Sequence, residues 1–397
     1  MALTADAPHE QFHFSMLWYD KRYRSNVIQI LVLATVLLVF GYLINNAANA
    51  LAAQQKTFGF DFLFLPASYD INQTLISYKS SDPHWRAAVV GILNTALVAV
   101  VGIFFATLIG FTLGVLRLSK NWLVSRLVYW YVEFTRNVPL LLQILFWYGI
   151  FINYFPHPKT FKGVDSSFFL TNRGIISPKP IFADSIWFVV AAFAIAIVGA
   201  VLYRRMARKK QEETGQISPV LLVSLGLILG LPTIAYFLAG MPVSFDYPNF
   251  KGFNFQGGMT ITPELAALTF ALAIYTAAFI SENVRAGILA ISHGQTEAAF
   301  ALGLRPNRTM NLIIIPQALR VIIPPLTSQY LNLAKNSSLA IAIGYMDVVA
   351  TLGGITLMQT GKELETNMLV MGFYLSVSLT ISAFMNWYNQ SMAFKER

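Results

Sequence analysis

Long apolar stretches recur along the chain and determine its predicted architecture. A helix rises about 1.5 Å per residue, so about 20 apolar residues cross a hydrocarbon core about 30 Å thick. The sequence therefore predicts an all-α membrane protein with about eight transmembrane helices. The expected helices lie near residues 27–45, 88–115, 138–155, 185–203, 218–240, 262–284, 312–334 and 365–388.

The first apolar stretch is interpreted as a membrane anchor and not as a cleaved secretory signal. Asn45 and Asn46 follow it, and no small-residue cleavage site stands out. Lys and Arg residues between the stretches indicate the orientation, because cytoplasmic loops are enriched in them. With a cytoplasmic N-terminus, 17 fall inside and 9 outside, and the densest run is 204–210. Both termini are therefore expected to face the cytoplasm.

Composition agrees with a membrane location and limits the other function classes. Only 12% of the residues are charged and 56% are hydrophobic, whereas a soluble domain averages about 25% charged residues. The net charge of +9 is spread among apolar spans without a solvated basic arm, so nucleic-acid binding is not expected. Because the chain has no cysteine, disulfides, thiolate metal sites and cysteine nucleophiles are excluded. The five histidines lie outside the spans and show no metal-ligand spacing.

Four regions are expected along the chain. Residues 1–87 hold an N-terminal cytoplasmic segment, the first span and an aromatic periplasmic loop. Residues 88–155 and 261–397 form two parts of a core, separated by an insertion, 156–260, that carries two extra spans and outer loops rich in Pro, Gly and Phe. We find no internal duplication, which argues against an inverted-repeat secondary transporter.

An amphipathic segment lies between the second and third spans. Apolar residues recur at helical spacing over 121–139, and Arg126, Glu133 and Arg136 interrupt them. Glu133 and Arg136 are three residues apart and could pair on one helical face. The segment is interpreted as an interfacial helix anchored by Trp and Tyr; the alternative is an elbow that contacts a partner subunit.

A short segment between the sixth and seventh spans, residues 294–316, carries the strongest functional signal. Gln295 to Leu302 is predicted to form a short Ala-rich helix, and Gly303 suits a C-terminal cap with left-handed backbone. A helix this short is unstable alone, so it needs a groove to occupy. Phe300 and Leu302 would provide apolar anchors in such a groove.

The segment from Glu297 to Pro316 reads E-A-A-x3-G-x9-I-x-I-P. This pattern is similar to the EAA loop of bacterial ABC importer permeases, whose usual ending is I-x-L-P; Ile315 is the one departure. The resemblance implies a type I ABC importer permease core. It also implies that an ATPase docks on this loop, through Glu297, Ala298, Ala299, Phe300 and Gly303.

Other segments narrow the resemblance to permeases of polar amino-acid uptake, the histidine/glutamine type. These segments are 137–143 (N-V-P-L-L-L-Q), 281–287 (S-E-N-V-R-A-G), 316–320 (P-Q-A-L-R) and 331–339 (L-N-L-A-K-N-S-S-L). The chain length and the extra pair of spans resemble the larger permease of general L-amino-acid Aap/Bzt systems. The resemblance covers about 88–155 and 262–390 well. The assignment of 1–87 and 156–260 depends only on the overall likeness to that subgroup.

The resemblance implies partners for the chain. They are cytoplasmic ATPase subunits, a second related permease in a heterodimer, a periplasmic amino-acid-binding protein and membrane lipid. The resemblance also implies a location in the bacterial inner membrane. No G-x4-G-K-[ST] motif occurs, because Gly361 and Lys362 are followed by Glu363. The chain is therefore expected to bind no cofactor and to be no enzyme, with ATP and Mg on the ATPase.

Polar residues inside the spans are candidates for the transport path, because buried polarity in a membrane is costly. On the seventh span, 328, 332 and 335 fall on one helical face, and Pro324 and Pro325 are expected to break the helix. Two sets follow. The translocation path or substrate set is Ser328, Gln329, Asn332 and Lys335. The gating or structural set is Glu282, Arg285, Arg320, Asn336 and Ser337, among which Asn336 and Ser337 are interpreted mainly as helix caps.

Three other function classes remain as alternatives. A secondary transporter would carry its own ion site and usually a repeat. An ion channel would show a filter segment or rings of charge. A membrane enzyme would need an acid–base or nucleophile constellation at membrane depth, which Glu282 alone does not make. The loop at 294–316 favours the ABC permease over all three.

Overall fold

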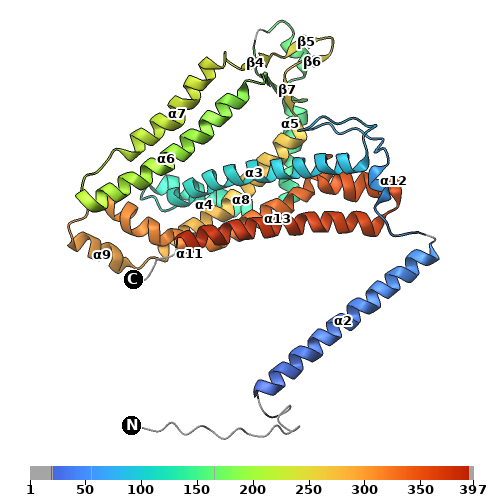
Figure 1. Ribbon diagram of the computed structural model, residues 1–397, viewed down its shortest axis with the longest axis horizontal. Coiled ribbons are helices and arrows are strands. Elements are labelled where there is room, and N and C mark those ends of the chain that lie inside the picture. The colour runs from blue at the N-terminus through green and yellow to red at the C-terminus, as the bar shows by residue number, and fades with distance from the viewer. Residues whose placement is uncertain (1–18, 20, 55, 165, 393–397) are drawn as a thin grey trace. The chain divides into compact units, whose positions relative to one another are not determined.

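The computed structural model describes residues 19, 21–54, 56–164 and 166–392, most of them in helices (Figure 1). The helices are α2 (Lys21–Ala53), η1 (Asp61–Phe64), α3 (His84–Leu116), α4 (Trp122–Asn137), α5 (Leu140–Tyr154), η2 (Pro158–Phe161), α6 (Ile186–Thr214), α7 (Val220–Leu238), α8 (Pro263–Leu289), α9 (His293–Ala301), α10 (Pro306–Thr309), η3 (Met310–Ile314), α11 (Ile315–Asn336), η4 (Ser337–Ile343), η5 (Val349–Thr356), α12 (Leu357–Thr360) and α13 (Glu363–Met392).

The long apolar helices match the predicted spans. Seven helices in the described residues are long and apolar enough to cross a membrane, and the bent pair α4 and α5 makes eight if it is one span. The mostly helical membrane fold is thereby confirmed. The orientation stays a prediction, and the terminal segments 1–18 and 393–397 lie outside the described residues.

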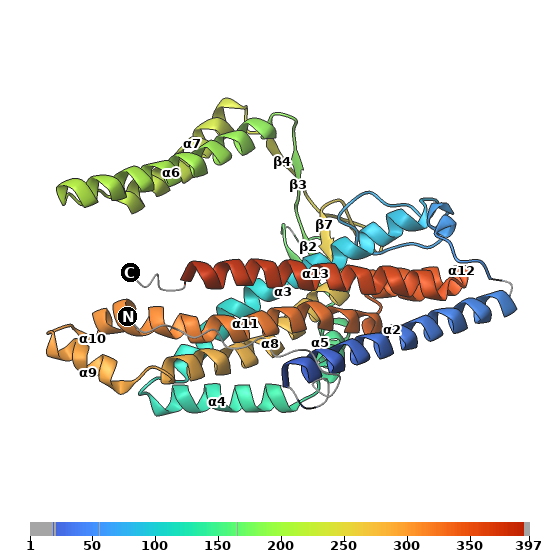
Figure 2. The same ribbon diagram turned by 60° about the horizontal axis from the view of Figure 1, so that its bottom comes forward.

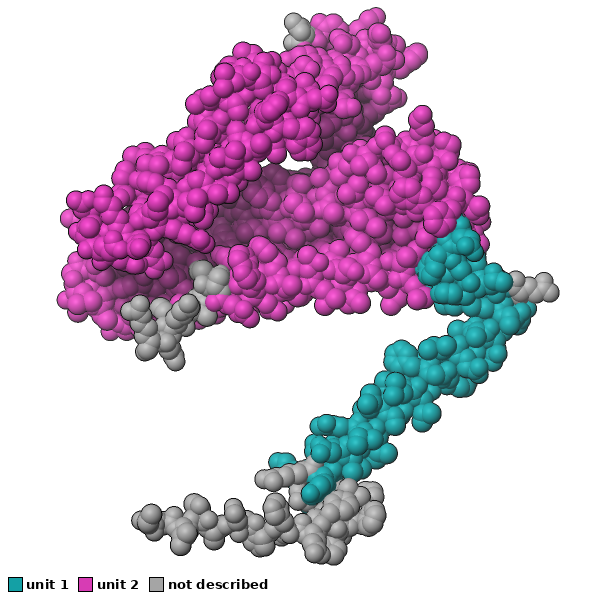
Figure 3. Space-filling model, viewed as in Figure 1, with its two compact units in different colours: residues 1–62, 362–365 teal, residues 63–361, 366–397 magenta. Residues whose placement is uncertain are grey.

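The chain divides into two compact units, 1–62 with 362–365 and 63–361 with 366–397 (Figure 3). In the first unit, the chain after α2 is tied to the start of α13. The Glu365 carboxylate accepts a hydrogen bond from the Gly59 N–H at 2.9 Å, and Lys56 pairs with Glu363 at 3.5 Å. The second unit holds α3 to α12, the rest of α13 and every candidate site residue.

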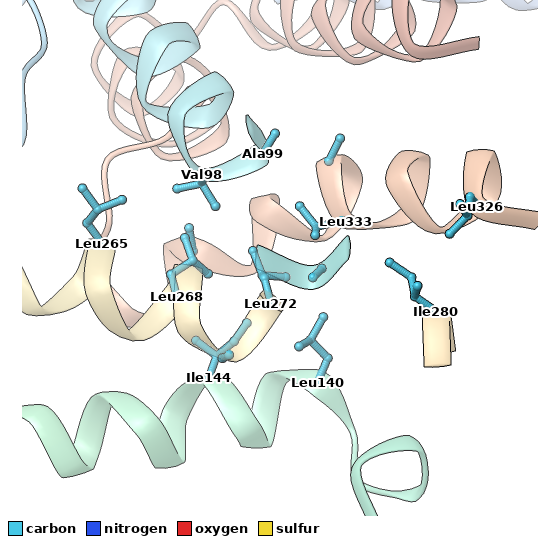
Figure 4. Packing of buried hydrophobic residues seen from close by; sticks show 14 of the residues in the cluster. Val98, Ala99, Leu140, Ile144, Leu265, Leu268, Leu272, Ile280, Leu326 and Leu333 are labelled. Carbon is cyan, nitrogen blue, oxygen red and sulfur yellow. The ribbon is translucent and has the colours of Figure 1, made fainter. Parts of the chain in front are cut away.

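Helix α8 is the centre of the second unit's core. Leu268 and Leu272 of α8 are fully buried, and they lie between Val98 of α3, Ile144 of α5 and Leu333 of α11 (Figure 4). Along α3, Gly110 and Gly114 allow α8 to approach closely. A Cβ at either glycine would lie 2.6 Å from a side chain of α8, so these sites exclude larger residues.

The amphipathic segment forms α4, and a sharp bend of 107° separates it from α5. Pro139 follows the last turn of α4 and has no N–H to continue it. The side-chain amide of Gln143 donates to the carbonyl oxygens of Thr135 and Val138, both at 2.9 Å. One buried glutamine therefore satisfies two carbonyls that the bend leaves open.

The insertion adds strands that the all-α prediction missed. They are β1 (Phe169–Thr171), β2 (Gly174–Ser177), β3 (Lys179–Phe182), β4 (Val243–Asp246), β5 (Asn249–Lys251), β6 (Asn254–Gln256) and β7 (Met259–Ile261). The pairs are antiparallel, in the orders β1-β2-β7, β3-β4 and β5-β6. Each strand has only three or four residues, too few for an alternating pattern to stand out in the sequence.

The predicted helix break at Pro324 and Pro325 is wrong. Helix α11 runs continuously from Ile315 to Asn336 with both prolines inside it. Both proline residues are exposed, so the rings lie on the outer face of the helix and do not disturb its packed side. The helix loses the two backbone donors but keeps its course.

Candidate functional site

The loop at 294–316 folds as a short helix with defined ends. The Ser292 hydroxyl accepts from the Gly294 N–H at 3.3 Å at the start of α9. At its end, the Gly303 N–H donates to the Phe300 carbonyl at 2.9 Å and the Leu304 N–H to the Ala299 carbonyl at 3.1 Å. These two bonds form a Schellman motif, and Gly303 has the positive φ of +73° that the motif needs.

Helix α9 buries one residue and exposes most of the others. Ala299 is 1% exposed and faces the protein, whereas Glu297 and Ala298 are exposed. Phe300 and Leu302 are 49% and 80% exposed, although both are large and apolar. The surface of this nine-residue helix and of its C-cap Leu302 thus consists of small side chains and two large apolar ones.

Helix α9 connects directly to two spans. Helix α8 ends at Leu289, four residues before α9 begins at His293, and α10 begins soon after Gly303 with Pro306 in its first turn (Figure 2). The side chains of Gln295 and Gln317 are hydrogen-bonded at 3.2 Å, which ties α9 to α11. Helix α9 is therefore joined to the ends of both α8 and α11.

A network of charged residues joins α8 to α3 and α4. Glu282 accepts from Arg117 through Oε2 and from Arg285 through Oε1, the latter at 2.7 Å. The second amino group of Arg117 lies 3.6 Å from Glu133. The Arg117 side chain is only 9% exposed, so it depends on these carboxylates for charge compensation.

The sequence predicted part of this network. Glu282 and Arg285, which the sequence placed together in the gating or structural set, form an ion pair. The proposed Glu133–Arg136 pair is replaced by the ion pair of Glu133 with Arg117, while Arg136 stacks over the Phe279 ring at 5.4 Å. Arg117 is separated from Glu282 by 165 positions, so sequence spacing alone gave no signal for their contact.

The polar residues of α11 form one face, as their spacing predicted. Ser328, Asn332 and Lys335 are exposed, whereas Gln329 is half-buried and lies one turn before the fully buried Leu333. Among the residues described, no hydrogen bond or ion pair joins this face to the Glu282 network. Ser328, Asn332 and Lys335 are thus exposed and separate from that network in this subunit.

The remaining candidates lie beside this face. The Ser337 hydroxyl is buried and donates to the Ala334 carbonyl at 2.7 Å, as expected for a residue that closes the last helical turn. Asn336 and Arg320 are half-buried on α11. Their gating or structural role stays a prediction.

Comparisons with known proteins agree with this geometry. A family described as "Binding-protein-dependent transport system inner membrane component" matches residues 213–393. The chain is 47% identical over 384 residues to the general L-amino acid transport system permease protein AapQ of Rhizobium johnstonii, covering 97% of this chain and 96% of that protein. It is 50% identical over 428 residues to the glutamate/glutamine/aspartate/asparagine transport system permease protein BztB of Rhodobacter capsulatus, with complete coverage of both.

The chain belongs to the family of amino-acid ABC transporter permeases. The permease is accordingly a multi-pass protein of the inner membrane and a transport component. Membership implies an ATPase and a substrate-binding protein as its partners.

The permease also has a buried acidic site that the sequence did not reveal. Asp347 lies between η4 and η5 and is fully buried. Its Oδ1 accepts from the Ala350 N–H at 2.8 Å, and the Tyr374 hydroxyl lies 3.5 Å from Oδ2. Burial raises the pKa of the Asp347 carboxyl to about 7. A single acidic residue between two irregular segments resembles a loop residue in the sequence, so nothing marked it as buried.

Proposed function

We propose that the permease carries L-amino acids inward across the bacterial inner membrane, with energy from ATP and Mg²⁺ bound by a separate ATPase. The observation that carries the proposal is the exposed helix α9, with Phe300 and Leu302 at its surface and α8 and α11 attached to its ends. The names of the relatives, which are amino-acid transport permeases, support L-amino acids as cargo.

Helix α9 would occupy a groove on the ATPase as a coupling helix. Ala298 permits close approach, Phe300 fills an apolar pocket and Glu297 supplies a charge at the edge of the contact. Ala299 faces inward and keeps α9 seated on its own subunit. The Schellman turn at Gly303 then directs the chain back into α10 and α11.

Movement of α9 would reach the membrane through α8 and α11. The Glu282 network holds the nearby part of α8 to α3 and α4, so these helices would move as one body. The Gln295–Gln317 bond passes the same movement to α11. Closure of the ATPase pair would thus change the permease from inward-facing to outward-facing.

The polar face of α11 would line the translocation path. Lys335 would pair with the α-carboxylate of an amino acid. The side chains of Asn332, Gln329 and Ser328 would accept hydrogen bonds from its α-amino group. A second, related permease would close the other side of the path, as the likeness to the Aap/Bzt subgroup suggests. A periplasmic binding protein would deliver the amino acid to the outer mouth.

A charge reversal on α9 tests the coupling role. We expect Glu297→Lys to lower the amount of ATPase that co-purifies with the tagged permease by at least fivefold, because the new charge would disturb the edge of the contact. Glu297 is exposed and forms no ion pair within the described part of the chain, so folding should be unaffected. Co-purification from solubilised membranes, followed by an ATPase assay, measures the recovered ATPase. The yield of the tagged permease in the same preparation shows whether it folds.

Glu213→Lys is the matched control for this experiment. It makes the same charge change on the same predicted side of the membrane, on α6, at a side chain that is 61% exposed. Undiminished ATPase recovery with Glu297→Lys, or an equal loss with Glu213→Lys, would count against a specific contact at α9.

A further inference from the structure

The end of α6 bears a concentrated basic surface that the coupling role does not use. Five basic residues occur between 204 and 210, and all five are exposed. The partner helix α7 and the connecting loop 215–219 contain no charged residue. The positive charge is therefore confined to one helix at one end of the hairpin formed by α6 and α7.

Helix geometry places this charge at the level of lipid phosphates. The apolar part of α6, residues 186–203, is about 27 Å long at 1.5 Å per residue, close to the thickness of the hydrocarbon core. Residues 204–210 continue the same helix for about 10 Å more, through the adjoining headgroup layer. The side chains of Arg204, Arg205 and Arg208 thus begin where the hydrocarbon ends.

The three arginines of α6 are exposed; Arg204 borders the side of the buried alanines, and Arg208 and Arg205 lie progressively farther from it. At about 100° per residue, they span about 100° of the helix circumference. The buried positions of α6 are Ala196, Ala200 and Ala207. Helices α6 and α7 lie side by side and are in contact (Figure 1). All three arginine side chains are therefore accessible from outside the protein.

Internal ion pairs leave most of this charge uncompensated. Arg208 pairs with Glu212 and Lys209 with Glu213, but these basic side chains are 82% and 79% exposed, so the pairs are weak. Arg204 and Arg205 form no ion pair with any described residue. Arg204 and Arg208 are one turn apart and repel each other, which a bound anion would relieve.

We propose that Arg204, Arg205 and Arg208 form a binding site for the phosphate of an anionic phospholipid. The guanidinium groups would donate hydrogen bonds to the phosphodiester oxygens, while the acyl chains lie along the apolar surface of α6. The site depends on the depth of these side chains along α6 and not on which leaflet they face. It is separate from α9, so its test is independent of coupling.

Lipid retention by the full-length permease tests the site. The protein is equilibrated in detergent with equal amounts of phosphatidylglycerol and phosphatidylcholine and purified, and the retained lipids are quantified by mass spectrometry. We expect phosphatidylglycerol to be enriched. The triple change R204Q/R205Q/R208Q should lower the enrichment at least tenfold, since a basic residue at an anionic surface contributes a factor of about five.

Two further variants separate a local site from net charge and from misfolding. Lys162→Gln, Lys179→Gln and Lys251→Gln together remove the same charge at exposed positions of the outer loops, and should leave the enrichment within twofold of the parent. The triple variant R204K/R205K/R208K should keep at least half of the parent's phosphatidylglycerol enrichment. An unchanged ratio in the Gln triple, an equal loss in the outer-loop control, or a loss in the Lys triple as large as in the Gln triple would overturn the proposal.

Discussion

Replacing Glu282 with Ala is expected to lower the free energy of unfolding of the permease by about 3 kcal/mol. The reason is that Arg117, whose side chain is 9% exposed, would keep only the longer contact with Glu133 at 3.6 Å. Arg285 would lose its carboxylate partner at the same time. Denaturant titration of the purified protein in detergent measures this loss of unfolding free energy.

Glu133→Ala is the comparison for this experiment. The Glu133 side chain is 34% exposed and its contact with Arg117 is long, so its removal should cost less than about 1 kcal/mol. If both variants lost the same stability, the Glu282 network would not hold α8 to α3. Coupling through a rigid α8 would then lose its physical basis.

Asp347 is expected to make stability depend on pH. Burial raises the pKa of this carboxyl to about 7 from its ordinary value of 3.8. The native state therefore binds the proton more tightly than the unfolded state. This group's contribution is fully present below about pH 4 and is lost as the pH rises through 7. Between pH 5 and pH 8 the loss amounts to about 3 kcal/mol.

Asp347→Asn isolates the effect, because the amide does not titrate. The variant should become more stable relative to the parent by about 3 kcal/mol as the pH is raised from 5 to 8. Thermal or denaturant unfolding of both proteins at the two pH values gives the comparison. Parallel pH dependences would show that Asp347 does not titrate in this range in the native state.

The sequence predicted most of the helices because membrane spans are long and their apolar pattern is local. It also predicted α9 and its cap, since a glycine at position 303 followed by Pro306 determines where a short helix must end. The expected break at Pro324 failed because local chemistry does not say which face of a helix the rings occupy.

Features that depend on distant residues were not accessible in this way. Arg117 meets Glu282 only because Gly110 and Gly114 let α3 lie close against α8. Asp347 is buried by the packing of η5 and α13 around it, not by its neighbours in sequence. Several short strands of the insertion likewise pair across its two loops, on either side of α6 and α7, such as Ile176 with Thr260.

Photo-cross-linking from position 300 tests the central claim most directly. A benzophenone amino acid replaces Phe300, which is 49% exposed on α9, and Ile217, which is 83% exposed in the loop between α6 and α7, serves as the control position. After irradiation of intact membranes, the adducts are identified by mass spectrometry. Coupling through α9 predicts an adduct with an ATPase subunit from position 300 and none from position 217. Failure of position 300 to label an ATPase, in membranes where the permease is active in transport, would contradict it.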